Sequence, residues 1–271
     1  MSYKIFFSDI DGTLLNSQRD LSELTISEIK RIKKNIPIIL VSARMPKQMY
    51  YLQEKLEILK SPLICYNGGL VLNDEKIIHS VEIPINHIEY LIHYNENISP
   101  EKFHISLFNN NDWYVEAYDY WAKREENNTK AIPQIKSNRE VLQLWKENGK
   151  GAHKITCMGD ATIIEKAFNH LKNEFNDSLH LYRSKDTYIE IANKEVSKLT
   201  GIHKLLEACY NITISEAIAF GDNYNDVEMI EAVGHGIAVK NARDEVKAVA
   251  SAITDNHYDD GVAKYLQKIF V

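Results

Sequence analysis

Cysteine is scarce in this chain of 271 residues, which contains only Cys65, Cys157 and Cys209. Their number is odd and they lie far apart in apolar contexts, so we expect buried free thiols in a reducing compartment and no disulfide framework. The ten histidines are scattered, with no H-x-x-x-H motif and no Cys/His cluster, which argues against a zinc site.

Long apolar runs are also lacking. Residues 36–41 form one of the longest, far short of the roughly 20 residues needed to span a bilayer. The opening Met1-Ser2-Tyr3-Lys4 leads directly into the first predicted strand and leaves no room for a signal peptide. Together with the free thiols, these features predict a cytoplasmic protein with no membrane partner.

An excess of basic charge is absent as well. The 32 Lys and Arg residues are outnumbered by 38 Asp and Glu, for a formal net charge of −6. A general nucleic-acid binder would carry a basic face, so we expect no nucleic-acid partner. A small phosphorylated molecule is compatible with this charge, because a lysine and a metal ion can reverse its sign within a site.

The most informative segment that is present is Phe6-Phe7-Ser8-Asp9-Ile10-Asp11-Gly12-Thr13. Residues 5–7 predict a short buried strand, and Asp9 and Asp11 follow it where open α/β sheets bind their ligands. Gly12 allows a sharp turn just beyond. Two carboxylates this close repel each other unless a cation lies between them, and a divalent metal ion is the obvious candidate. The alternative is an acidic turn after a strand.

The first 80 residues alternate between strands and helices. Strands are predicted at 5–7, 38–41 and 63–66, helices at 21–35 and from Pro46, and a hairpin at 70–78. Thr25 and Glu28 stand at capping-box spacing in the first of these helices. This order predicts a parallel sheet with crossover helices.

The pattern changes near residue 84 and returns from residue 197. In between, strands are predicted at 103–108, 113–116, 153–158, 179–183 and 187–192, and helices at 85–95, 118–126, 139–146 and 162–175. Strands next to strands, with helices between them, predict an α+β sheet with helices on one face. We therefore predict a discontinuous, Rossmann-like, doubly wound α/β core at 1–83 and 188–271, with an inserted α+β cap at 84–187.

Polar residues follow three of the apolar strands predicted for the core. Ser42 follows the strand at 38–41, and Gly221-Asp222-x-x-Asn225-Asp226 begins at the end of the strand at 217–220. If these strands are parallel neighbours of the first one, their ends converge at one edge of the sheet. Magnesium prefers one or two carboxylates together with water and phosphate oxygens, and Asp9 and Asp222 could supply them. The alternative for the loop that begins at Asp222 is an Asx-rich helix cap.

This arrangement resembles the haloacid dehalogenase superfamily of phosphotransferases over nearly the whole chain. Its four motifs are matched by Asp9-x-Asp11-Gly12-Thr13, by Ser42, by Lys198 and by Gly221-Asp222-x-x-Asn225-Asp226. The insertion after Asn67-Gly68-Gly69 resembles the cap of the Cof-type subgroup. Ser42 and Lys198 are single residues that gain weight only from their positions, since alone they would suit a helix cap and a solvated surface.

The chemistry of these residues agrees with what the resemblance implies, a magnesium-dependent phosphatase of small phosphorylated metabolites such as sugar phosphates or cofactor- and nucleotide-type phosphates. Asp9 is expected to attack phosphorus and become an aspartyl phosphate. Asp11 is expected to protonate the leaving group and then to take a proton from water. Lys198 and a Mg²⁺ ion held by Asp9, Asp222 and the backbone carbonyl of Asp11 would supply positive charge.

Other residues are expected to support this chemistry. Ser42, a backbone amide at Ala43 and Asn225 would hold the phosphoryl oxygens, with orientation of Lys198 as the alternative for Asn225. Asp226 and Thr13 would lie behind the metal ligands, where Asp226 holds metal-bound water. Ala43 stands where the family commonly has glycine, and it would be strained if the backbone there needs a positive φ.

The cap is expected to exclude water from the site and to read the leaving group. Its aromatic residues could stack on a sugar or a base, although we expect most of them to cover the cap's own sheet or its interface: Trp113, Tyr114, Tyr118, Tyr120 and Trp121. Arg124, Arg139 and Arg183 could bind an anionic substrate tail, although a surface role is expected for each.

Two other functions stay open. One is a sugar phosphomutase on the same fold, which should be activated by a bisphosphate. The other is a non-catalytic regulator that binds phosphorylated metabolites. The presence of both Asp9 and Asp11 argues against the regulator, because a binding module needs no nucleophile together with an acid. Nothing in the sequence indicates an oligomeric state.

Overall fold

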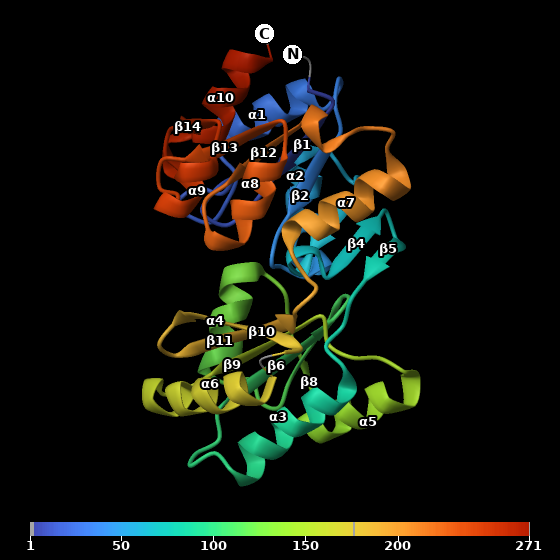
Figure 1. Cartoon of the computed structure of the whole chain (residues 1–271), viewed down its shortest axis with the longest axis vertical. Coiled ribbons are helices and arrows are strands. Elements are labelled where there is room, and N and C mark those ends of the chain that lie inside the picture. The colour runs from blue at the N-terminus through green and yellow to red at the C-terminus, as the bar shows by residue number, and fades with distance from the viewer. Residues whose placement is uncertain (1–2, 176, 271) are drawn as a thin grey trace. The chain divides into compact units, whose positions relative to one another are not determined.

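The computed structural model describes residues 3–175 and 177–270, and within them the chain divides into two compact units (Figure 1). The core unit combines the residues up to His79 with those from Ser197 onward, and the cap unit is Ser80–Val196. The predicted architecture, an α/β core with an inserted sheet domain, is confirmed. Residues 1–2 and 271 of the predicted core, and residue 176 of the predicted cap, lie outside the described residues.

The core unit is built on a sheet with the strand order β14-β13-β12-β1-β2-β3-β4-β5. Its strands are β1 (Ile5–Ser8), β2 (Ile38–Val41), β3 (Leu63–Cys65), β4 (Leu70–Asn73), β5 (Lys76–Ser80), β12 (Ala217–Gly221), β13 (His235–Val239) and β14 (Ala252–Thr254). From β14 to β3 neighbouring strands are parallel, and β4 is antiparallel to β3. Every residue of β1, β2 and β12 is buried, which explains why these strands are continuous apolar runs in the sequence.

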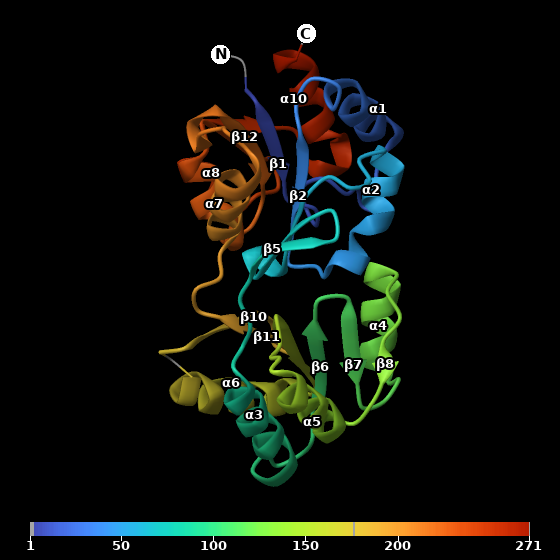
Figure 2. The same ribbon diagram turned by 90° about the vertical axis from the view of Figure 1, so that its right-hand side faces the viewer.

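Helices cover both faces of this sheet, with α1, α2 and α10 on one side and α7 and α8 on the other (Figure 2). The helices of the core unit are α1 (Glu23–Ile32), α2 (Tyr50–Leu56), α7 (Lys198–Cys209), α8 (Val227–Ala232), α9 (Asp244–Val249) and α10 (Gly261–Ile269), with 3₁₀ turns η1 (Pro46–Gln48), η2 (Tyr66–Gly68), η3 (Ile214–Glu216), η4 (Tyr224–Asp226) and η5 (His257–Asp259).

The predicted capping box at the start of α1 is wrong. Ser22 is the N-cap of this helix, and its side chain accepts the backbone N–H of Thr25. Thr25 therefore lies inside the first turn and cannot itself cap the helix.

The cap unit has a second sheet, with the strand order β10-β11-β9-β6-β7-β8. Its elements are α3 (Ile85–Asn97), β6 (His104–Asn109), β7 (Asp112–Val115), α4 (Tyr120–Thr129), β8 (Gln134–Ile135), α5 (Asn138–Asn148), β9 (Lys154–Met158), α6 (Ala161–Phe175), β10 (Leu179–Lys185) and β11 (Tyr188–Asn193). Helices α3, α5 and α6 lie on the same side of this sheet (Figures 1 and 2) and share one hydrophobic cluster with it. The two-residue strand β8 was not predicted.

The insertion extends further in both directions than the predicted 84–187. Strand β11 pairs antiparallel with β9 and β10, so it belongs to the cap sheet and cannot begin the second half of the core. The division at its carboxyl side instead lies between Val196 and Ser197, just before α7. Among the described residues, no helix is both long and apolar enough to cross a membrane.

Candidate active site

The ends of three neighbouring parallel strands form the candidate active site. Strand β1 lies between β2 and β12, and all three run in the same direction. Asp9 follows β1, Ser42 follows β2 and Asp222 follows β12, so the convergence predicted at this edge of the sheet is observed.

Lys198, the first residue of α7, lies between two carboxylates. Its Nζ is 2.5 Å from Asp9 Oδ1 and 2.6 Å from Asp226 Oδ1, and its side chain is completely buried. Burial would lower the pKa of Lys198, but the carboxylates of Asp226 and Asp9 outweigh it and raise the pKa above its ordinary value. Lys198 is therefore a fixed cation, and the alternative of a solvated surface lysine is excluded.

The pKa of Asp9 is raised, chiefly because its carboxylate is buried. Burial raises the pKa of Asp9 well above its ordinary value; Lys198 lowers it, while Asp226 and Asp222 raise it further. Its second carboxylate oxygen, Oδ2, is buried and has no hydrogen-bond partner among the described residues. A buried, unpaired carboxylate oxygen is costly unless a cation or a ligand completes it.

The turn after β12 is organised by Asp226, whose Oδ2 accepts the backbone N–H groups of Asp222 at 2.9 Å and Asn223 at 3.0 Å. Thr13 donates its hydroxyl to Asp222 Oδ1 at 3.0 Å. Burial, together with the nearby Asp226 charge, raises the pKa of Asp222 to about 6. Thr13 and Asp226 thus hold the Asp222 loop.

These acidic residues fit a divalent metal ion. Asp9, Asp222 and Asp226 each offer an oxygen, and the three oxygens lie within 4.8 Å of one another. Both oxygens of Asp226 already accept hydrogen bonds, so the unpaired Asp9 Oδ2 and the Asp222 carboxylate are the better donors. Hard carboxylate oxygens in excess of the local positive charge are the set that binds such a cation.

The side chain of Asp11 has a partner that the sequence reasoning missed. Arg44 binds it in a bidentate ion pair, with Nε 2.7 Å from Oδ2 and Nη2 2.7 Å from Oδ1. Burial would raise the pKa of Asp11, but the Arg44 guanidinium outweighs it and the pKa lies below its ordinary value. The one sequence feature that could have indicated this ion pair is the arginine two residues after Ser42. Because its side chain is engaged, Asp11 could reach a metal ion only through the predicted backbone carbonyl.

The predicted phosphate ligands occupy the neighbouring loops. Ser42 is buried, and its Oγ accepts the backbone N–H of Arg44 at 3.2 Å. Ala43 is absent from the described residues with positive φ, so the strain considered for it does not occur. Asn225 donates its side-chain N–H to Asn67 Oδ1 at 2.9 Å. Lys198 is held by the carboxylates of Asp9 and Asp226, so its orientation does not require Asn225.

Most of the cap aromatics considered for substrate stacking have structural partners. Trp113 is buried and stacks on Phe108 at 5.6 Å, and Tyr114 packs edge-on against Trp145. Tyr120 is the most exposed of the set, at 69%. The three arginines each have a partner inside the cap: Arg124 has the Trp121 ring, Arg139 has Glu96 and Arg183 has Asp186.

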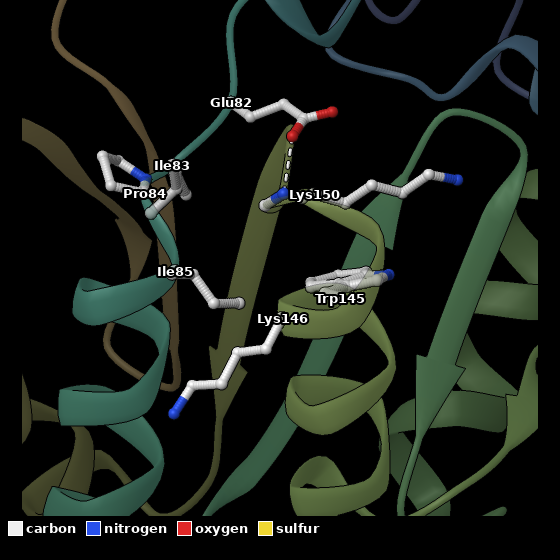
Figure 3. A pocket seen from close by; sticks show the side chains of 9 residues that line it. Glu82, Ile83, Pro84, Ile85, Trp145, Lys146 and Lys150 are labelled. Carbon is white, nitrogen blue, oxygen red and sulfur yellow. Dashed lines mark hydrogen bonds between the residues drawn. The ribbon is translucent and has the colours of Figure 1, made fainter.

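The cap unit also contains a cavity of about 300 Å³ beside the segment through which the chain enters it (Figure 3). It is lined by residues 82–85, by Trp145 and Lys146 of α5, and by residues 149–151. Glu82 Oε2 accepts the Gly151 N–H at 2.5 Å. The aromatics and arginines predicted to read the leaving group do not line it, so it is not that predicted subsite.

A parallel sheet with acidic turns after adjacent strands, and a buried lysine between carboxylates, defines a phosphoryl-transfer site of the α/β class. The family described as haloacid dehalogenase-like hydrolase matches residues 6–266, and the chain belongs to this family. Within it the chain is a phosphatase with an inserted cap and an aspartate nucleophile.

Individual relatives match over nearly their full length. A Haemophilus influenzae protein is 33% identical over 274 residues, which cover 100% of this chain and 99% of the relative. The Bacillus subtilis 5-amino-6-(5-phospho-D-ribitylamino)uracil phosphatase YitU is 26% identical over 272 residues, covering 97% and 96%. The crystal structure of a haloacid dehalogenase-like hydrolase from Bacteroides thetaiotaomicron matches with a TM-score of 0.90 at 26% identity, covering 99% of this chain and 100% of that one.

Proposed function

We propose that the chain hydrolyses small phosphorylated metabolites in a magnesium-dependent reaction that passes through an aspartyl phosphate on Asp9. The observation that carries the proposal is the state of Asp9. One of its oxygens is held by Lys198, and the other is buried without a hydrogen-bond partner among the described residues. A carboxylate fixed in this way beside a buried cation is suited to attack an electrophile that brings its own negative charge.

In the first step, Asp9 attacks phosphorus, the bond from phosphorus to the ester oxygen breaks, and Asp11 gives its proton to the departing alkoxide. In the second, water attacks phosphorus while Asp11 takes a proton from it, and the Asp9 carboxylate is released with inorganic phosphate. Arg44 favours the ionised form of Asp11, which suits the second step and opposes the first, in which Asp11 must carry a proton. Lys198 counters the charge that develops on the phosphoryl oxygens.

The remaining residues bind and position. Asp9 and Asp222, with the backbone carbonyl of Asp11, would hold Mg²⁺, which supplies positive charge against the phosphoryl oxygens when bound. Ser42, the Ala43 amide and Asn225 would hold those oxygens. The relative that acts on a phosphorylated ribitylaminouracil supports a small phosphorylated metabolite as substrate, and we include sugar phosphates in the proposed range.

The test is a phosphatase screen with MgCl₂, using para-nitrophenyl phosphate and a panel of phosphorylated metabolites. We expect phosphate release that EDTA abolishes and excess Mg²⁺ restores. Asp9→Asn should be inactive because its amide cannot attack phosphorus, and mass spectrometry of acid-quenched wild type should detect a phosphate adduct on Asp9. Full activity of Asp9→Asn would contradict the covalent mechanism.

Asp11→Asn tests whether Asp11 acts as the acid and base of the two chemical steps. We expect kcat to fall by about 10²–10⁴ while thermal stability is retained, because general acid–base catalysis is lost. A rate that depends on added sugar bisphosphate, with a phosphorylated sugar as product in place of inorganic phosphate, would instead indicate a phosphomutase.

A further inference from the structure

The backbone of η2 is unusual for the residues that form it. Tyr66 and Asn67 both carry a Cβ and yet have positive φ angles of 52° and 55°, and Gly68 follows at 101°. Asparagine tolerates a left-handed backbone, whereas a bulky residue such as Tyr66 adopts it only at a cost that surrounding contacts must offset. Residues in such conformations are concentrated at ligand and catalytic sites, so the contacts of η2 are informative.

Asn67 is bound on two sides by loops of the candidate active site. Its backbone N–H donates to the Ser42 carbonyl at 2.9 Å, and its side-chain Oδ1 accepts from Asn225 Nδ2 at 2.9 Å. Asn67 and Asn225 are 158 positions apart in the sequence. One residue therefore joins the loop after β2 to the turn after β12.

Gly68 brings the third loop into contact. A Cβ on this residue would lie 2.1 Å from the Ser197 carbonyl oxygen, so only glycine permits the observed approach. Ser197 is the N-cap of α7, whose first residue is Lys198. The short segment η2 thus contacts three parts of the chain that carry predicted phosphate ligands: the loop after β2, the turn after β12 and the start of α7.

We propose that Asn67 is a positioning residue that orients the carboxamide of Asn225 for binding the phosphate of the substrate. A carboxamide nitrogen has two N–H donors, and Asn67 accepts one of them. This hydrogen bond fixes the rotation of the amide group and leaves its second N–H for a phosphoryl oxygen. The proposal rests on the phosphatase function above, because it specifies how that site holds its substrate.

The test is a double-mutant cycle between Asn67 and Asn225. Asn67→Gly removes the side chain while glycine readily keeps the left-handed backbone and its N–H to Ser42. We expect kcat/KM for para-nitrophenyl phosphate to fall about tenfold, mainly through KM, as for a lost hydrogen bond to a charged group. Asn225→Ala should lose at least as much, and the double variant should match Asn225→Ala alone.

A second readout is binding of inorganic phosphate, measured as competitive inhibition. Its inhibition constant should rise in Asn67→Gly by the same factor as kcat/KM falls, whereas a structural role in folding would lower the thermal midpoint without this match. Asp74→Gly is the matched control, since Asp74 is exposed and also has a positive φ, of 56°. It should leave both constants unchanged.

Losses that multiply in the double variant, or an unchanged kcat/KM in Asn67→Gly, would overturn the proposal. If the glycine variant does not fold, the same cycle is run with Asn67→Ser, which is neutral and too short to replace the carboxamide. Wild type without phosphatase activity would overturn the proposed function itself. An active wild type with an additive cycle would overturn only the role of Asn67.

Discussion

Charged side chains are concentrated in the active site where water is excluded. Lys198 and Asp226 have fully buried side chains, and that of Asp9 is 8% exposed. Burying ion pairs contributes little to stability, because the cost of desolvation offsets most of the attraction. Their arrangement is better explained by chemistry, since strongly perturbed groups beside a specific charged partner mark functional sites.

The ion pair between Arg44 and Asp11 leads to a prediction for the catalytic rate. In Arg44→Lys, the two parallel hydrogen bonds to Asp11 cannot both form, because an ammonium group lacks the planar fork of a guanidinium. We expect kcat to fall about 10- to 100-fold with little change in KM, since Asp11 loses its orientation but the phosphate contacts remain. Steady-state kinetics on para-nitrophenyl phosphate measures both constants.

Arg31→Lys is the matched control for this substitution. Arg31 lies on α1 with an exposed side chain, and it also pairs with a carboxylate, that of the buried Glu28, through Nε and Nη2. It should retain the kinetics of wild type. Retention of the wild-type kcat by Arg44→Lys would show that the ion pair does not orient Asp11 for catalysis.

The turn after β1 leaves no room for a side chain at Gly12. Gly12 has a φ of +88°, and a Cβ there would lie 2.5 Å from Asp222 Oδ2. We expect Gly12→Ala to lower the free energy of unfolding by about 1–2 kcal/mol through backbone strain. It should also reduce kcat/KM by about 10- to 100-fold, because Asp222 must move.

Gly149→Ala separates the effect of backbone strain from the effect of moving Asp222. Gly149 also has a left-handed backbone, with a φ of +61°, but a Cβ there would meet nothing within 4 Å. It should lose about 1 kcal/mol of stability and no activity. Urea unfolding and kinetics of the two variants give the comparison, and equal activities would mean that Asp222 tolerates the added methyl group.

The buried side chain of His153, just before β9, predicts that the stability of the protein depends on pH. His153 precedes this strand and is buried; its Nδ1 accepts the Asn110 N–H, and its Nε2 lies 3.0 Å from the Ser80 hydroxyl. Burial, with a smaller contribution from Lys150, lowers the pKa of His153 from 6.5 to about 4. The Glu82 carboxylate lies 4.0 Å from Nε2.

The direction in which stability changes with pH follows from the lowered pKa of His153. The unfolded chain takes up a proton near pH 6.5 and the folded chain near pH 4, so the stabilising contribution of neutral His153 is complete above pH 6.5 and is lost between these values. Unfolding of wild type and His153→Gln in urea at pH 7 and 4.5 measures it. The decrease on acidification should be about 2–3 kcal/mol smaller in the variant; equal decreases would refute the assignment.

At the scale of the whole molecule, the chain consists of two units with separate hydrophobic interiors. The cap has its own buried cluster, which includes Leu171, while Ile39 is buried in β2 of the core sheet. Multidomain proteins commonly unfold in more than one step, so we expect two calorimetric transitions. Leu171→Ala should lower the midpoint temperature of one transition and Ile39→Ala that of the other. Each substitution should cost about 2–5 kcal/mol in the free energy of unfolding of its unit. A single transition shifted by both variants would contradict independent units.

Much of this organisation was already determined by the sequence. The uninterrupted apolar runs of β1, β2 and β12, separated by helical patterns, predict a parallel sheet because only buried strands are apolar throughout. The polar residues that follow those runs predict a site at one edge of the sheet. The end of the insertion was misplaced because β11 has the same local pattern in either unit, and only its pairing with β9 and β10 assigns it to the cap.

Tertiary structure alone decided how the site residues are paired. Asp11 is bound to Arg44, 33 positions away, and Asn225 is bound to Asn67, 158 positions away. No local pattern encodes such pairs, because their proximity arises from the order of strands in the sheet and from the left-handed backbone of η2. The sequence by itself therefore determined which chemical groups this protein brings to the end of β1, and the fold decided which of them hold the others in place.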